Sequence, residues 1–193
     1  MSYDFHLFTP VEGVETLETA RVTLDMETEE LNPGLPDPRK EQQKRQNAAL
    51  LQMVNRNLEI FSFDYAEIAR ASGISETDAR TRFRHLELNG PEDGNGIQIT
   101  LADDTASITV PYWHTGDHAK PVLDEVWQYL LVLERRSGFL TYDPQLERVL
   151  RLDSDLPEVV ERYRAVADRL PEIATRKLDE RRLPTRRAWW KFW

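Results

Sequence analysis

The most constraining feature of the sequence is an alternating segment, residues 97–113, that predicts a β-hairpin. Apolar and polar residues alternate on both sides of the turn dipeptide Asp103-Asp104. A period of two places the apolar side chains on one face of a strand, and aspartates favour tight turns. The preceding residues 90–96 are rich in glycine, which is typical of a further turn. We therefore expect an antiparallel hairpin with one buried face.

Helical patterns flank this hairpin on both sides. A wide apolar stripe follows Pro121 and stops at Ser137-Gly138, which predicts a long amphipathic helix. Similar but weaker patterns predict helices over residues 39–58, 65–71 and 157–170, with another helix starting at Glu76. Residues 3–9 and 139–142 alternate like strands, while residues 80–88 fit either the end of a helix or a strand.

The order of these elements predicts an α+β fold. We expect a mostly antiparallel sheet of about four to five strands with helices packed on one face. A chain of 193 residues fits one such domain, residues 1–175, with a helical insert at 39–83. Residues 176–193 form a basic, aromatic C-terminal tail.

The charge of the chain is unevenly distributed. The net charge is −9, while residues 176–193 carry seven basic and two acidic side chains, which leaves residues 1–175 at −14. An acidic body repels nucleic acid and anionic membranes and favours a basic protein partner. No run of 18 apolar residues indicates a membrane span, and the N-terminal residues lack a signal-peptide pattern, so we expect a cytoplasmic protein.

Catalytic patterns are weak in this sequence. The absence of cysteine excludes disulfides and thiolate sites, and no nucleophile elbow, phosphate-binding glycine loop or dinucleotide fingerprint occurs. The acids Asp103, Asp104 and Asp143 sit where turns and strand ends commonly place them. We therefore expect a protein that is not an enzyme and needs no cofactor.

One alternative is a metal-dependent enzyme. His114 and His118 are four residues apart, and Asp117 adds a carboxylate between them. On a helix this spacing would put both imidazoles on one face, where they could bind a metal ion with Asp117 as a third ligand. Gly116 and the adjacent predicted strand favour a polar loop instead.

A second alternative is a helix-turn-helix DNA-binding regulator at residues 65–85. Gly73 would form the turn, Ser75 would cap the second helix, and Arg80, Arg82 and Arg84 would face DNA. Residues 76–88 also contain three acidic residues, Glu76, Asp78 and Glu87, which offset those arginines, and DNA affinity depends largely on phosphate neutralisation. A plain helical hairpin is therefore the favoured interpretation of this pattern.

The tail is aromatic as well as basic. Trp189, Trp190, Phe192 and Trp193 lie among arginine and lysine residues. Such residues suit docking on a protein groove or at a membrane surface, and they equally suit folding back onto the chain's own domain.

Several short motifs resemble those of a group of small, uncharacterised bacterial α+β proteins, some of which look like immunity proteins that block toxins. The motifs are Met1-Ser2-Tyr3-Asp4, Leu86-Glu87-Leu88-Asn89, Gly96-Ile97-Gln98-Ile99, Ile108-Thr109-Val110-Pro111-Tyr112-Trp113-His114 and Tyr142-Asp143-Pro144-Gln145. The resemblance implies a non-enzymatic binding protein that neutralises a toxin, and it transfers no catalytic residue. Together with the acidic body, it leads us to expect a basic protein partner.

Overall fold

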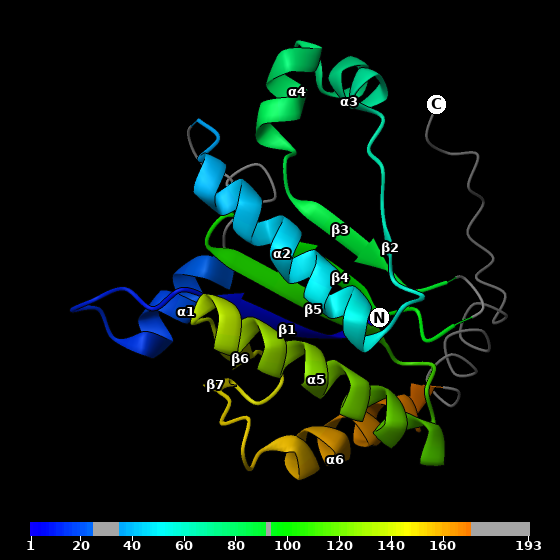
Figure 1. The fold of residues 1–193 in the computed structure, drawn as a ribbon. Coiled ribbons are helices and arrows are strands. Elements are labelled where there is room, and N and C mark those ends of the chain that lie inside the picture. Colours follow the sequence, from blue (N-terminus) through cyan, green and yellow to red (C-terminus); the bar gives the residue numbers. More distant parts are fainter. Residues whose placement is uncertain (25–34, 92–93, 171–193) are drawn as a thin grey trace, which may run out of the picture.

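A computed structural model describes residues 1–24, 35–91 and 94–170 of the chain (Figure 1). Its centre is a seven-stranded sheet with the order β2-β3-β4-β5-β1-β6-β7, in which all six neighbouring pairs are antiparallel. The strands are β1 (Ser2–Phe8), β2 (Glu59–Ile60), β3 (Leu86–Asn89), β4 (Gln98–Leu101), β5 (Thr105–Pro111), β6 (Leu140–Asp143) and β7 (Arg148–Val149).

The expected α+β class is confirmed, and the expected strand number is wrong. The sheet has seven strands instead of four to five, and the difference comes from the edge strands β2 and β7, which contain two residues each. Two residues are too few to show an alternating pattern, so neither strand can be identified from periodicity. The predicted hairpin is present as β4 and β5, joined at residues 102–104.

The helices cover the sheet unequally. They are α1 (Thr16–Leu24), α2 (Pro38–Val54), α3 (Tyr65–Ser72), α4 (Glu76–Arg82), α5 (Ala119–Ser137) and α6 (Leu156–Ala167), with a short 3₁₀ helix η2 (Gly116–His118). In Figure 1, α2 and α5 cross the same face of the sheet, α6 lies beside α5, and α3 and α4 project beyond β3.

α1 is the exception to the expectation that helices pack on one face. Phe8, Tyr142 and Ala20 form a small buried cluster separate from the main core. Phe8 follows Leu7 in β1, and successive side chains of a strand point to opposite faces. α1 therefore covers one corner of the sheet face opposite α2 and α5.

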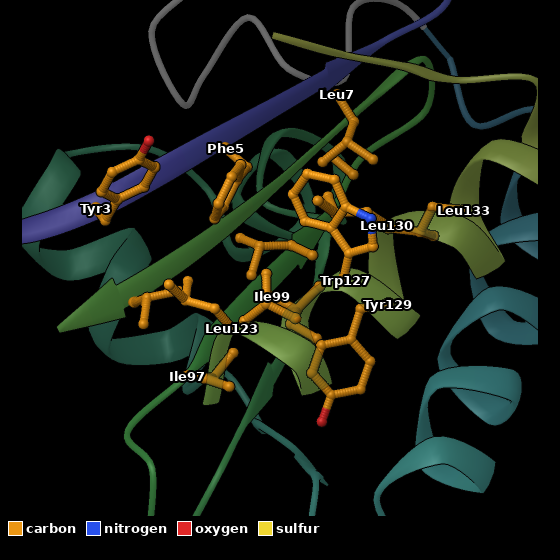
Figure 2. Close-up of a cluster of buried hydrophobic side chains, with 14 of the residues drawn as sticks. Tyr3, Phe5, Leu7, Ile97, Ile99, Leu123, Trp127, Tyr129, Leu130 and Leu133 are labelled. Carbon is orange, nitrogen blue, oxygen red and sulfur yellow. The ribbon is translucent and has the colours of Figure 1, made fainter. Parts of the chain in front are cut away.

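The main core lies between the sheet and α5. Figure 2 shows Phe5 and Leu7 of β1 near Trp127 and Leu130 of α5. Leu130 is fully buried, and burying a leucine side chain stabilises the fold by about 2 kcal/mol. The predicted apolar stripe is therefore the contact surface of this helix, which ends at Gly138 in the left-handed conformation.

α2 joins the same layer with a much more polar sequence. Its buried residues are Lys44, Asn47, Ala48 and Leu51, of which only Ala48 and Leu51 belong to the apolar core. Asn47 donates a hydrogen bond to the Ser137 hydroxyl of α5 at 2.8 Å. Residues 39–83, predicted as an insert, thus contribute both a core helix and the edge strand β2.

The local capping signals in residues 64–76 are confirmed. Asp64 and Ser75 accept backbone N–H groups at the starts of α3 and α4, and Gly73 ends α3 with a φ of 67°. α4 ends at Arg82 and β3 begins at Leu86, which resolves the choice between helix and strand at residues 80–88. Within the described residues, no helix is long and apolar enough to cross a membrane.

Candidate partner-binding site

An open apolar pocket lies at the end of β5, where the chain leaves the sheet. We call it the Trp113 pocket, and its volume is about 900 Å³. The lining residues are Met1, Ser2, Gly96, Gln98, Thr109, Pro111, Tyr112, Trp113, Thr115, Ala167 and Leu170. No side chain in this described lining carries a carboxylate, imidazole, ammonium or guanidinium group, so the pocket is suited to binding and offers no acidic or basic side chain for acid–base catalysis.

The alternation of β5 continues past its last residue and sets the direction of two aromatic side chains. Tyr112 is buried, whereas the side chain of Trp113 is exposed, with 62% of its surface accessible. Tyr112 stacks on Tyr163 of α6, with ring centroids 5.1 Å apart, and this contact fixes the inner wall. A large exposed aromatic beside an apolar pocket is typical of a protein-binding hot spot.

Gly96 allows the Trp113 ring to lie directly against the backbone. A Cβ atom built on Gly96 would be 2.2 Å from Cζ2 of Trp113. Gly96 also has a φ of 64°, which disfavours other residues. The glycine-rich turn recognised in the sequence therefore has a specific purpose, since it makes room for the tryptophan that borders the pocket.

A polar network fixes the loop that carries Gly96. Asn95 donates to Glu125 of α5 at 3.1 Å, and Asn55 donates to the same carboxylate at 2.7 Å. Tyr129 also donates to Glu125, and burial together with this hydrogen bond raises the pKa of the Tyr129 phenol. The Asn95 carbonyl is 2.6 Å from Nε2 of His114. These contacts connect the loop before Gly96 to α5 and to the segment that follows Trp113.

The residues predicted as metal ligands do not form a metal-binding group. His114 bonds to the Asn95 carbonyl, while Asp117 and His118 are exposed on η2. Asp117 lies 3.9 Å from the guanidinium of Arg164. Across residues 1–24, 35–91 and 94–170, no set of three or more histidine, aspartate or glutamate side chains is arranged to hold a metal ion.

Asp143 has a structural environment. Its carboxylate is fully buried and accepts hydrogen bonds from the Tyr3 hydroxyl at 2.5 Å and from the backbone N–H groups of Gln145 and Leu146. Burial raises the pKa of Asp143 despite these donors. Nearby, Tyr163 donates to the Pro111 carbonyl, so the cluster joins β1, β5, β6 and α6.

A buried ion cluster joins α2, the start of β3 and the β4–β5 turn. Asp103 lies 2.6 Å from Nη2 of Arg84 and 3.0 Å from Nζ of Lys44, and Glu41 lies at the rim. Lys44 also donates to the Arg84 carbonyl. Burial by itself raises the pKa of Asp103, but the hydrogen bonds from Lys44 and Arg84 outweigh it and lower that pKa. Glu41 and Lys44 are neighbours on α2, but no sequence signal links them to Arg84 and Asp103, which are far away in the chain.

The three predicted DNA-contacting arginines have different surroundings. Arg84 is buried in the ion cluster, so its guanidinium has no access to a DNA backbone in this structure. Arg80 pairs with Glu76 at 2.7 Å and lies over the Tyr65 ring. Arg82 is in the last turn of α4 and also has an interaction partner. Two short helices joined by a turn are present, but the charges of these arginines are largely used within the protein.

The predicted partner-binding residues Trp189, Trp190, Phe192 and Trp193 lie outside the described residues. Comparison of the chain with models of known protein families, with curated proteins and with solved structures found no match.

Proposed function

We propose that this chain is a non-enzymatic binding protein that recognises a protein partner through the Trp113 pocket. The observation that carries the proposal is an apolar pocket of about 900 Å³ beside an exposed tryptophan, whose described lining has no charged side chain. Interface hot spots are enriched in tryptophan at well-packed apolar pockets. An apolar or aromatic side chain of the partner fits this chemistry.

The acidic body supports a basic partner. Residues 1–175 have a net charge of −14, which steers a cationic protein toward the surface and accelerates association. The resemblance to immunity-like proteins suggests that such a partner is a toxin, and inhibition would follow from covering the toxin's surface. This mechanism requires no catalytic residue in the chain.

The internal use of the titratable groups also favours binding over catalysis. Asp103 and Asp143 are both held in structural hydrogen bonds, and the described pocket lining contains no acidic or basic side chain. Protein binding therefore explains the site better than the metal-enzyme or DNA-binding alternatives.

The test is capture of a partner by the immobilised full chain from lysate of the producing cells, followed by affinity measurement with the purified partner. Trp113→Ala should weaken binding by at least about 30-fold, as expected for a hot spot of 2 kcal/mol or more. Met53→Ala is the matched control, because Met53 is also an exposed apolar residue but lies on α2. Equal affinities for the two variants would contradict the proposal.

A second pair of variants tests the geometry of the pocket. Gly96→Ala places a Cβ against the Trp113 ring. Gly73 has a similar φ of 67°, but a Cβ built there meets no other heavy atom within 4 Å, so Gly73→Ala is the matched control. Backbone strain should cost each variant about 1–2 kcal/mol of stability, and the contact with Trp113 should make Gly96→Ala the less stable of the two. Only Gly96→Ala should also weaken partner binding, as measured by calorimetry.

Salt should weaken partner binding by the unmodified chain, because it screens the attraction between the acidic body and a basic partner.

A further inference from the structure

The Trp113 pocket lies where the described part of the chain ends. Leu170 is the last described residue before position 171, and its side chain lines the pocket together with Ala167. The following 23 residues therefore begin at the pocket wall. A tethered group competes at an effective concentration on the order of millimolar, so even weak affinity for the pocket is sufficient for occupancy.

The chemistry of that following sequence matches the pocket. Four of its last five residues are aromatic, and the pocket lining is predominantly apolar. Its volume of about 900 Å³ accommodates more than one ring. The 19 residue steps from Leu170 to Trp189 span at most about 65 Å when extended, so chain length does not prevent a return to the pocket.

Charges around the pocket favour the same occupant. Arg186, Arg187 and Lys191 flank the aromatic residues. Asp4 accepts a hydrogen bond from Ser2 of the lining, and Asp168 accepts one from the Gly116 N–H beside Thr115. Carboxylates thus lie next to two sides of a pocket whose described lining has no charged side chain, an arrangement that suits an aromatic segment with cationic neighbours.

We propose that the aromatic residues 189–193 occupy the Trp113 pocket of their own chain and compete there with the partner. This inference rests on the proposed function in one respect, because the competition requires that the partner use the same pocket. The aromatic segment would then regulate access, and a partner would have to displace it before binding.

Disulfide trapping tests the contact in the full chain, which contains no cysteine of its own. The test variant carries Thr115→Cys and Ala188→Cys, which puts one thiol at the pocket and one beside the aromatic residues. The control variant carries Arg70→Cys and Ala188→Cys, because Arg70 is equally exposed but lies on α3. A disulfide requires Cα atoms within about 7 Å, so trapping reports close approach.

We expect the Thr115/Ala188 pair to close within one chain at least about tenfold faster than the Arg70/Ala188 pair, at a rate independent of protein concentration. Replacing Trp189, Trp190, Phe192 and Trp193 by alanine in the test variant should reduce its rate to that of the control. Equal rates in the two variants would overturn the proposal. Covalent dimers in place of closed monomers would also overturn it, since the occupant would then belong to a second copy.

The competition is measured separately with the captured partner. The same four alanine substitutions, in the chain without added cysteines, should raise partner affinity, whereas Trp113→Ala should lower it. If the Thr115/Ala188 disulfide does not form faster than the control but partner capture depends on Trp113, only the proposal that residues 189–193 occupy the pocket is refuted. If the disulfide forms as expected but Trp113→Ala does not change partner affinity, only the proposed function is refuted.

Discussion

Two buried aspartates, Asp103 and Asp143, show how differently one residue type behaves in two regions of the molecule. Asp103 lies in the ion cluster between two cations, Lys44 and Arg84, and its pKa is lowered. Asp143 lies in the tyrosine cluster among neutral donors, and its pKa is raised. Burial opposes ionisation in both places, so the charge of the neighbours determines the direction in which each pKa moves.

The largest expected effect is the removal of the carboxylate from the ion cluster. Asp103→Ala should reduce the free energy of unfolding by about 3–5 kcal/mol, because it leaves the two buried cations Lys44 and Arg84 with only Glu41, at the rim, as a counter-charge. Asp104→Ala is the matched control; its partner Lys40 is partly exposed, so the expected loss is about 0–1 kcal/mol. Urea denaturation measures both, and similar losses would show that the cluster contributes no special stability.

The acid dependence of stability should identify Asp103 as ionised in the native state. Its lowered pKa contributes stability that is present above the ordinary value of 3.8 and is lost as pH falls through the lowered folded value. Asp103→Asn should therefore lose about 3 kcal/mol at neutral pH, the lower end of the range for a broken buried ion pair, because asparagine keeps the shape of the side chain but not its charge. The difference from the unmodified chain should shrink in acid. A difference that stays constant in urea titrations down to about pH 3 would contradict this environment.

Asp143→Asn should give the opposite pH dependence and a smaller effect. A raised pKa means that the folded state binds the proton more tightly, so the unmodified chain loses stability as pH rises from 3.8 through the folded value. Asparagine avoids that penalty and still accepts the two backbone N–H groups. We expect a change within about 1 kcal/mol at neutral pH, with the variant gaining relative to the unmodified chain as pH rises, in the same urea titrations.

The smallest expected effect concerns a charge pair in solvent. Arg80 and Glu76 are each at least half exposed on α4, so Arg80→Ala should cost only about 0.3–0.5 kcal/mol. The same variant, combined with Arg82→Ala, tests the DNA-binding alternative in a fluorescence anisotropy titration. We expect no salt-sensitive duplex binding that depends on these arginines; its appearance would favour a regulator over a protein-binding module.

The sequence was sufficient for elements whose signals are local. The apolar stripe of α5 and the caps at Asp64, Gly73 and Ser75 lie within single segments, and each predicts its element correctly. The two-residue strands β2 and β7 have no such signal, because pairing with a longer neighbour defines them.

The sites were less predictable than the fold for the same reason. Lys44, Arg84 and Asp103 each resemble an ordinary surface charge until the fold brings them together. Trp113 was recognised only as part of a motif, and the pocket beside it depends on Gly96 and on the end of α6. Such contacts join distant segments, and no periodicity within one segment encodes them.

The short edge strands affect how these molecules meet one another in solution. β1 and β5, the two seven-residue strands, are paired on both sides inside the sheet, while β2 and β7 offer two residues each at the edges. Unpaired edges are where sheets recruit further chains, and short edges present little backbone for that growth. The described sheet thus offers little unpaired backbone for fibre-like stacking, because its shortest strands lie at its edges.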